Sequence, residues 1–236
     1  MNYKFSVVTP NYNTEKYIKQ TIKSVLRQTY PYWEMVIVDD ASTDRSVEII
    51  ETFVKKDSRI KLFRHEKNTG VAQTKHDGIV NSTGDIVTTL GGDDMLARRA
   101  LAIMNKAYNK YPEEFIYANF LRCTEKWMIP YKPGFSRKIP EGQTALEANC
   151  VSALRTFKRK KYFETELLDP GIKRAVDKDL IYKLEEVCSL RFIPRFLYHY
   201  RMRRDSISHG EGLQKAIDWH GIVRENARKR RSAKSK

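Results

Sequence analysis

Short runs of β-branched residues alternate with longer segments of helical periodicity over residues 1–111, and this alternation restricts the fold more than any other feature. The expected strands are Tyr3–Pro10, Trp33–Asp40, Arg59–His65 and Gly84–Gly91. The expected helices are Thr14–Gln28, Asp44–Asp57, Gly70–Ser82 and Arg98–Tyr111. We expect Asn13 or Thr14 to cap the first helix, and Ser42 or Thr43 to cap the second. Strands alternating with helices of this length predict an α/β fold with a mostly parallel sheet flanked by helices.

In such sheets, ligands bind beyond the carboxyl ends of the strands, near the point where the strand order reverses. Three polar segments follow strands in this chain: Thr9–Asn13 (TPNYN), Asp39–Asp44 (DDASTD) and Gly91–Asp94 (GGDD). Because parallel strands end at one edge, we expect the three segments to lie together. Two of them carry adjacent aspartates, whose mutual repulsion needs compensation. This edge is the predicted ligand site.

The rest of the chain is less regular. Residues 114–123 predict a strand, 124–143 a long loop or hairpin, and 144–164 a helical or mixed segment. A helix is expected over 177–187, and a strand interrupted by Pro194 over 191–203. A mixed half that follows a parallel half indicates one domain whose second part completes a cleft. The expected divisions are 1–111, 112–210 and a basic C-terminal helix or tail over 211–236.

The net charge of +15 on 236 residues favours anionic partners such as phosphates, nucleic acid or acidic lipid headgroups. Part of this charge lies in Arg224–Lys236. That segment is either a solubilising, partly disordered terminus or an anchor on an anionic membrane surface. The chain has no interleaved basic and aromatic module, so nucleic acid is not an expected partner.

Two observations bear on the compartment. No apolar run approaches the length that spans a bilayer, and the first ten residues lack the pattern of a secretory signal. We therefore expect a cytoplasmic protein, with the inner face of the membrane as a second candidate location. Cys123, Cys150 and Cys188 show no metal-ligand spacing, and we expect reduced thiols that are buried or partly buried.

The acid pairs each have two explanations. Asp93 and Asp94 could hold Mg²⁺ or Mn²⁺ together with substrate phosphates, since hard cations prefer oxygen ligands. They could also belong to an ordinary turn in which an aspartate caps the following helix. Asp39 and Asp40 end a buried strand, where a nucleobase or ribose would offset the cost of desolvation; capping is again the alternative.

Asp177 is a candidate general base on the far side of the cleft. It could equally be a helix N-terminal acid that complements the helix dipole. The residues alone do not separate Asp177 from Asp179. The sequence has no Walker or GxGxxG loop, so binding of phosphate depends on a metal ion and basic side chains.

Taken together, the motifs resemble those of the family 2 glycosyltransferases. The matching segments are FSVVTPNYN, YIKQTIKSVLRQTY, WEMVIVDDASTD, NTGVAQTKHDGI, STGDIVTTLGGDD and DKDLIYKL. Their order and spacing also match, over roughly Lys4 to Ser208. The late YRxHxxS element of the family is similar to YRMRRDSIS, with Arg203 in place of the usual histidine.

This resemblance implies a GT-A fold, with a Rossmann-like sheet, and inverting transfer of a sugar from a nucleoside diphosphate, a UDP-sugar first of all, to an acceptor hydroxyl. By the family pattern, residues 1–111 bind the nucleotide sugar and 112–210 the acceptor. Pro10, Tyr12 and Asp40 would border the nucleobase, with Lys75 near the nucleotide. Asp93 would contact the ribose or the metal ion, Asp94 would hold Mn²⁺ or Mg²⁺, and Asp177 would be the base.

The chain departs from the family pattern at two further positions. Gly91 replaces the first acid of the usual DxDD, and Val176 replaces the glutamate of the usual ED. These departures leave a second hypothesis open, a catalytically weak relative that binds a nucleotide sugar or a partner enzyme. The basic tail suggests a lipid-linked acceptor, or another glycan, in the synthesis of cell-surface polysaccharide or glycolipid.

Overall fold

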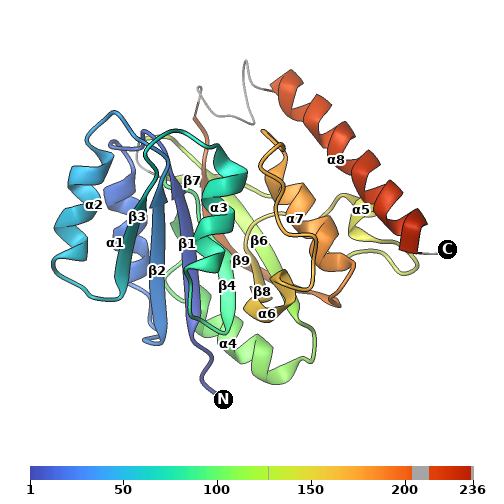
Figure 1. Cartoon of the computed structure of the whole chain (residues 1–236). Helices are drawn as coiled ribbons and strands as arrows, with labels where there is room; N and C mark the ends of the chain where they lie inside the picture. The colour runs from blue at the N-terminus through green and yellow to red at the C-terminus, as the bar shows by residue number, and fades with distance from the viewer. Residues whose placement is uncertain (127, 204–212, 235–236) are drawn as a thin grey trace.

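The computed structural model describes residues 1–126, 128–203 and 213–234, and is built around a nine-stranded mixed β-sheet (Figure 1). Four parallel strands form the first part of the sheet, in the order β3, β2, β1, β4. Their bounds are Phe5–Asn11 (β1), Trp33–Asp39 (β2), Ile60–Arg64 (β3) and Ile86–Thr89 (β4). β2, β3 and β4 lie within the predicted segments, and β1 extends one residue past its segment, to Asn11, so the parallel half of the predicted α/β fold is confirmed.

The second half adds strands of both directions. Their bounds are Met95–Leu96 (β5), Phe115–Cys123 (β6), Pro130–Pro133 (β7), Arg155–Lys158 (β8) and Leu190–Arg201 (β9). β8 runs antiparallel between β4 and β6, and β9 runs parallel to β6. β7 pairs with β6, so the predicted loop or hairpin is a hairpin. The segment 144–164 proves to be mixed, with β8 between two short helices.

β9 continues through Pro194, where the sequence suggests an interruption. Its register against β6 pairs Phe192 with Tyr117 and then Phe196 with Asn119, which leaves Pro194 in an irregular stretch between them. Because proline has no N–H to donate, it is tolerated where a ladder is locally broken. The proline therefore marks a shift of register inside one strand.

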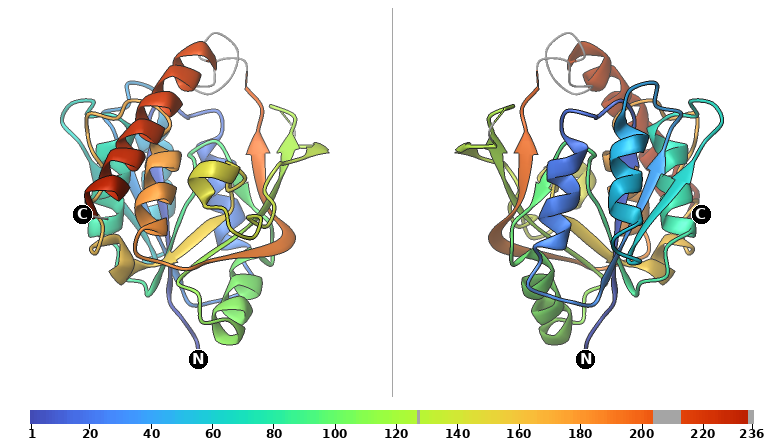
Figure 2. Two further views of the ribbon diagram at one scale, coloured as in Figure 1. Left: turned by 90° about the vertical axis from the view of Figure 1, so that its right-hand side faces the viewer. Right: turned by 90° about the vertical axis from the view of Figure 1, so that its left-hand side faces the viewer.

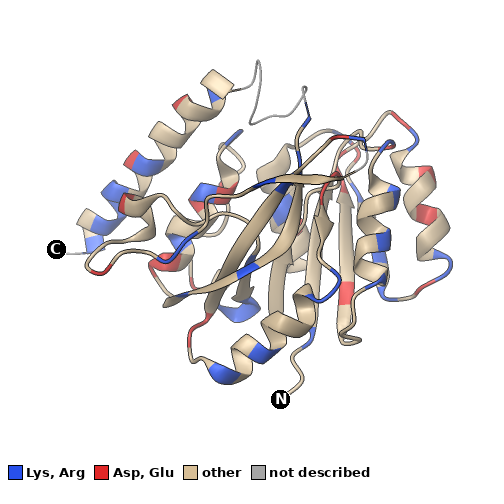
Figure 3. Cartoon of the chain, turned by 180° about the vertical axis from the view of Figure 1, so that it is seen from behind, with Lys and Arg blue, Asp and Glu red and all other residues tan. Residues whose placement is uncertain are grey.

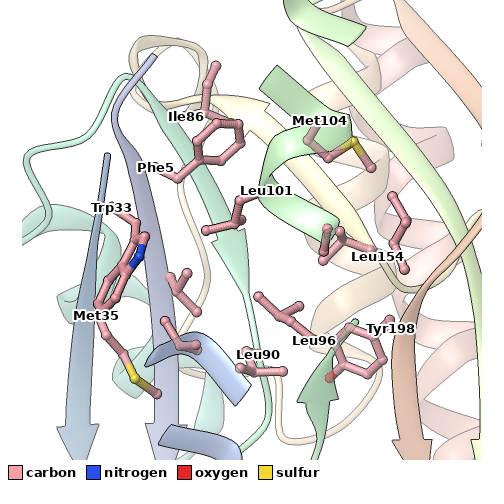
Figure 4. Close-up of a cluster of buried hydrophobic side chains, with 14 of the residues drawn as sticks. Phe5, Trp33, Met35, Ile86, Leu90, Leu96, Leu101, Met104, Leu154 and Tyr198 are labelled. Atoms are coloured by element: carbon pink, nitrogen blue, oxygen red, sulfur yellow. The ribbon is translucent and has the colours of Figure 1, made fainter. Parts of the chain in front are cut away.

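Helices cover both faces of the sheet (Figures 1 and 2). One face packs against α1, α2 and α4, and the other against α3 and α7, with α8 outside α7. The bounds are Ile18–Leu26 (α1), Ser46–Val54 (α2), Val71–Val80 (α3), Ala100–Lys110 (α4), Ala145–Ala148 (α5), Arg159–Tyr162 (α6), Val176–Glu185 (α7) and Leu213–Lys234 (α8). Successive side chains of β1 point to opposite faces of the sheet. Phe5 and Val7 belong to the hydrophobic core on the side of α1, α2 and α4, drawn in Figure 4, and Val8 belongs to the core on the side of α3 and α7.

The predicted N-caps of the first two helices are wrong. α1 begins after Tyr17 and α2 after Arg45, and neither residue caps its helix with a side chain. The hydroxyl groups that were expected to cap serve the loops instead. Thr14 Oγ1 donates to Asn11 Oδ1, and Ser42 Oγ donates to Asp39 Oδ1 at 2.6 Å. The loops after β1 and β2 therefore use their polar side chains to fix their own shape.

The C-terminal segment forms a long helix rather than a disordered terminus. α8 packs beside α7 through Val223 and Ala227, which are fully buried (Figure 2). Arg231 and Lys234 of α8 form ion pairs with Glu185 and Glu186. The expected boundary at residue 211 lies outside the described residues. Across the described ranges, no helix is both long enough and apolar enough to cross a bilayer.

Candidate functional site

The carboxyl ends of β1, β2 and β4 open into a cleft of about 640 Å³. Residues from β8, β9 and α7 line its other side. Every site residue predicted from the sequence contributes to the lining: Pro10, Tyr12, Asp40, Lys75, Asp93, Asp94 and Asp177. The cleft therefore lies at the edge of the sheet that the sequence predicts, next to the point where the strand order reverses between β1 and β4.

The acids at the end of β2 are satisfied by the protein itself. Asp39 accepts hydrogen bonds from Asn11 Nδ2 at 2.7 Å and from the Ser42 backbone N–H at 2.9 Å. Asp40, 3% exposed, accepts from the Thr69 N–H at 2.8 Å and the Gly70 N–H at 2.9 Å. The protein therefore supplies hydrogen-bond partners to both acids. The cost of burying two adjacent carboxylates is then not by itself evidence for a ligand.

Gly70 and His65 explain how Asp40 stays ionised. Gly70 has a φ of 91°, a conformation that glycine adopts readily and that places its N–H toward Asp40. His65 Nδ1 lies 2.8 Å from Asp40 Oδ1. Burial would raise the pKa of Asp40, but the hydrogen bonds from His65, Thr69 and Gly70 hold that pKa below its ordinary value. The proposed contact between Asp40 and a nucleobase stays a prediction.

The loop after β1 presents an open aromatic face. Tyr12 is 49% exposed, although it lines the cleft. The loop around it is held by the Asn13 N–H, which donates to Ser42 Oγ at 2.9 Å, and by the Thr14 N–H, which donates to Ser46 Oγ at 2.9 Å. A fixed loop with an exposed aromatic ring can stack against a planar ligand group at little entropic cost.

The two acids of the GGDD segment have different environments. Asp94 is 5% exposed, and its oxygens accept from the Tyr198 hydroxyl at 2.5 Å and the Arg201 N–H at 2.7 Å. Burial and the neighbouring Asp93 raise the pKa of Asp94 well above its ordinary value. Asp93 is more open, and its Oδ2 pairs with Arg203 Nη1 at 2.8 Å. Asp94 therefore anchors the segment to β9, while Asp93 faces the cleft.

The residues present fit a divalent cation that arrives with a diphosphate. Among the described residues, no group of three or more His, Cys, Asp or Glu side chains could hold a metal ion. Mg²⁺, however, is commonly bound by one or two carboxylates with substrate phosphates as further ligands. At Gly91, a Cβ would come within 2.9 Å of Asp93 Oδ1 and 3.1 Å of Asp94 Oδ2. The missing side chain thus leaves space beside both carboxylates.

Asp177 lies in the first turn of α7 and faces the cleft between two cations. Its carboxylate pairs with Lys75 Nζ of α3, and Arg155 Nη2 of β8 lies 3.0 Å from its Oδ2. Asp179 points elsewhere, because it is buried against Lys183 at 2.8 Å. Of the two aspartates that the sequence leaves open, Asp177 lines the cleft and Asp179 does not, and the role of Asp177 as a base stays a prediction.

The sequence reasoning missed several residues that shape the cleft. Arg155 lies in the segment interpreted as helical or mixed, where nothing distinguishes one arginine from its basic neighbours. Tyr198 and Arg201 lie in the irregular final strand, and only the pairing of β9 with β5 and β6 brings them to Asp94. Arg203 was identified only as a departure from a motif. The second part of that motif, residues 204–208, lies outside the described residues.

Comparisons with known proteins agree on one family. The model for glycosyl transferase family 2 matches residues 6–167. EpsJ of Bacillus subtilis strain 168, an uncharacterized glycosyltransferase, is 37% identical over 215 residues, which cover 86% of this chain and 62% of EpsJ. The glycosyltransferase GlyA of Streptococcus pneumoniae serotype 4 (TIGR4) is 28% identical over 222 residues, covering 87% and 31% of the two chains. A shorter match, 43% over 89 residues, joins the chain to TuaG of Bacillus subtilis strain 168, a putative teichuronic acid biosynthesis glycosyltransferase, covering 38% and 35%.

Solved structures share the fold. S. aureus TarS 1–349 in complex with UDP-GlcNAc superposes with a TM-score of 0.73 at 20% identity, covering 93% of this chain and 65% of that one. The mannosyltransferase PcManGT of Pyrobaculum calidifontis, in complex with GDP-Man and Mn²⁺, gives 0.62 at 19%, covering 82% and 55%. The predicted GT-A fold is confirmed by these likenesses. The chain spans less than half the length of GlyA and TuaG.

Proposed function

The chain belongs to glycosyltransferase family 2, and on that premise we propose that it transfers a sugar from a UDP-sugar to an acceptor hydroxyl, with inversion at the anomeric carbon. One observation carries the proposal: the carboxyl ends of β2 and β4, together with α7, bring Asp40, Asp93, Asp94 and Asp177 to a single cleft beside buried cations. The complexes of TarS with UDP and with UDP-GlcNAc support UDP as the nucleotide.

Asp177 serves as the general base in this reaction. Its carboxylate accepts the proton of the acceptor hydroxyl while the acceptor oxygen forms a bond to the anomeric carbon. The bond from that carbon to the diphosphate oxygen breaks on the opposite face, and the nucleoside diphosphate leaves with the bonding electrons. A positioned base of this kind accelerates a reaction about 10²–10⁴-fold.

The nucleotide lies along the ends of β1 and β2 in this proposal. Pro10 and the exposed ring of Tyr12 border the nucleobase, and Asp40 orients it. Lys75, 7% exposed and on the cleft wall, faces the phosphates. The reverse orientation would place the phosphates against Asp40, where the protein's own donors already hold a negative charge.

Asp93 and Asp94 are the residues that would hold Mn²⁺ or Mg²⁺. When bound, the ion neutralises the charge that develops on the leaving diphosphate. The PcManGT complex with Mn²⁺ supports a divalent ion in this fold. Of the two carboxylates, Asp93 is the more accessible ligand, because both oxygens of Asp94 already accept hydrogen bonds. Asp94 would be the second ligand, and its hydrogen bonds with Tyr198 and Arg201 also fix the segment on β9.

The acceptor is a glycan or a lipid-linked glycan of a cell-surface polysaccharide or glycolipid. The name of TuaG supports the polysaccharide class. Residues 112–210 supply the acceptor side of the cleft in this proposal, although Arg155 and Arg203 from that half reach the donor side. The cytoplasmic location at the inner face of the membrane stays a prediction.

A thermal-shift screen tests the donor. UDP-, GDP- and dTDP-sugars are added with Mn²⁺, and we expect the UDP-sugars to raise the unfolding temperature. The same screen with EDTA in place of Mn²⁺ tests the metal ion through binding rather than turnover. A protein that responds to none of the three nucleotide classes would contradict the proposed function.

The second candidate function is a weak relative that binds nucleotide sugar or a partner enzyme without turnover, which Gly91 and Val176 favour. The Asp177→Asn variant separates the two. If the chain is an enzyme, the variant loses sugar transfer and donor hydrolysis by about 10²-fold or more. Rates that are equal in the variant and the wild type would rule out Asp177 as the base.

A further inference from the structure

Asp177 is the solvent-facing member of a trio of charges. Its side chain is 41% exposed, whereas those of Lys75 and Arg155 are each 9% exposed. Lys75 reaches it from α3 and Arg155 from β8, so two separate elements converge on one carboxylate. A third cation close by is Lys178 of α7, whose Nζ donates instead to the Val151 carbonyl at 2.9 Å.

This arrangement holds Asp177 as a weak base. Burial would raise the pKa of Asp177, but the charges of Arg155 and Lys75 outweigh burial and hold that pKa well below its ordinary range. A general base works best when its pKa lies near the working pH. The ion pairs of Asp177 with Lys75 and Arg155 must therefore weaken before the carboxylate can accept a proton efficiently.

The two cations can serve a second anion. Arg155 Nε is buried without a hydrogen-bond partner in the described part of the chain. Apart from Asp177, the Arg155 guanidinium reaches Thr89 Oγ1 at 3.5 Å. Both Arg155 and Lys75 line the cleft. Buried donors without partners are uncommon, and phosphate oxygens satisfy guanidinium and ammonium donors with strong, charge-assisted bonds.

We propose that the diphosphate of the donor takes over Lys75 and Arg155 and thereby frees Asp177 to act as the base. The inference rests on the proposed function and adds Arg155 to it as a diphosphate-binding residue. Before the donor binds, Asp177 and the diphosphate site share the same two cations. After it binds, the phosphate oxygens satisfy both, including Arg155 Nε, and the carboxylate is left to the acceptor hydroxyl.

This competition makes the base active only when a donor is present. Asp177 then lowers the affinity for the nucleoside diphosphate, because the phosphates must displace it from the cations. An ordinary base with no such partners would leave that affinity unchanged. The binding of UDP alone, measured without an acceptor, therefore distinguishes the two cases.

Isothermal titration calorimetry with UDP, or with GDP or dTDP if the donor screen selects one of them, tests the proposal at a fixed Mn²⁺ concentration. We expect Asp177→Asn to bind the nucleotide at least about fivefold more tightly than the wild type. The matched control is Glu164→Gln, which removes a 47% exposed carboxylate paired with Lys161 outside the cleft. This control should bind as the wild type does.

A second experiment tests whether Asp177 affects nucleotide affinity through the two cations. In an Arg155→Met background, the gain in affinity from Asp177→Asn should shrink to less than about half of the gain in the wild-type background. If Arg155→Met fails to fold, Lys75→Met is used in its place. If Asp177→Asn fails to fold, Asp177→Ala is used. Unchanged or weaker binding by the Asp177 variants overturns the inference alone, as does a gain that persists in full without either cation. A wild-type protein that binds none of the three nucleotides overturns the proposed function as well.

Discussion

Glu34 shows how single residues keep a buried carboxylate ionised in this sheet. It is 2% exposed on β2, and it accepts hydrogen bonds from Lys61 Nζ at 2.9 Å, Ser6 Oγ at 2.7 Å and the Thr83 N–H at 2.5 Å. Burial would raise the pKa of Glu34, but these donors together lower it to about 2. The charge thus fastens three neighbouring segments of the sheet to one another.

The pH dependence of stability follows from this shift. Because the pKa of Glu34 is lower in the folded state than its ordinary value of 4.5, its contribution is complete above pH 4.5 and is lost as the pH falls through about 2. We expect Glu34→Gln to lower the free energy of unfolding by about 2–3 kcal/mol at pH 7, and by far less near pH 2. Urea denaturation over this pH range measures the difference.

The control for this prediction is Glu48→Gln. Glu48 of α2 pairs with Arg45, and its side chain is 64% exposed, so its loss should leave the free energy of unfolding nearly unchanged. A stability difference between Glu34→Gln and the wild type that stays constant with pH would show that the buried charge is not its cause.

Arg203 occupies the place where the family pattern has a histidine, and its guanidinium already pairs with Asp93. The positive charge of Arg203 beside Asp93 opposes the binding of a metal ion to the oxygen atoms of the same carboxylate. We therefore expect Arg203→His to raise the affinity for Mn²⁺ about tenfold in the presence of UDP. Titration of Mn²⁺ followed by electron paramagnetic resonance measures this affinity. Arg195, which is exposed on β9, gives the control, Arg195→His, and equal affinities in both variants would contradict the expectation.

Among the elements, the loops after β1 and β2 and the final strand decide the shape of the site. The loops hold each other through Asn11, Asn13 and Ser42, and β9 supplies Tyr198 and Arg201 to Asp94. A segment far along the chain thereby fixes the acids that follow β4. The site is a meeting of loops from the parallel half with one strand from the mixed half.

α8 is held to the domain by a narrow apolar contact. Val223 is fully buried in the core that α7 also lines, whereas the preceding residue, Ile222, is 46% exposed. We expect Val223→Asp to lower the free energy of unfolding by about 2–4 kcal/mol, because it buries a charge without a partner. Ile222→Asp is the matched control and should cost less than about 1 kcal/mol. Thermal or urea denaturation measures both, and equal losses would mean that α8 is not docked as described.

For the whole molecule, the charge is distributed unevenly between the two ends. Figure 3 shows Lys and Arg residues gathered in the C-terminal half of α8, with α2 at the opposite side of the domain. Part of the basic charge of α8 is neutralised by Glu185 and Glu186, but Arg228 and Lys229 remain exposed. The face available to an anionic surface is therefore smaller than the sequence of the tail suggests.

We expect the intact protein to sediment with vesicles that contain acidic lipid, and less so as salt rises. The double variant Arg228→Glu and Lys229→Glu should weaken this binding about tenfold or more, at about 1 kcal/mol for each basic residue lost. Lys55→Glu and Lys56→Glu, directly after α2, make the same change of charge at the other side of the molecule. Equal binding by both double variants would argue against docking through α8.

The sequence by itself determined the parallel half of the sheet, the edge at which ligands meet, and the cleft position of the seven predicted residues. It could do so because alternating strands and helices leave few topologies, and because parallel strands end on one side. The buried thiols Cys123 and Cys150 also follow from local context. All of these depend on short-range patterns.

Only the tertiary structure decided what surrounds each acid. Hydrogen-bond partners come from distant segments: Asp40 is satisfied by residues 65–70, Asp94 by β9, and Asp177 by α3 and β8. Local sequence carries no record of such partners, so it could not show that the protein itself supplies donors to Asp40 or that two cations hold Asp177. The charge state of a carboxylate depends on what surrounds it in space, and that is set by the packing of the whole chain.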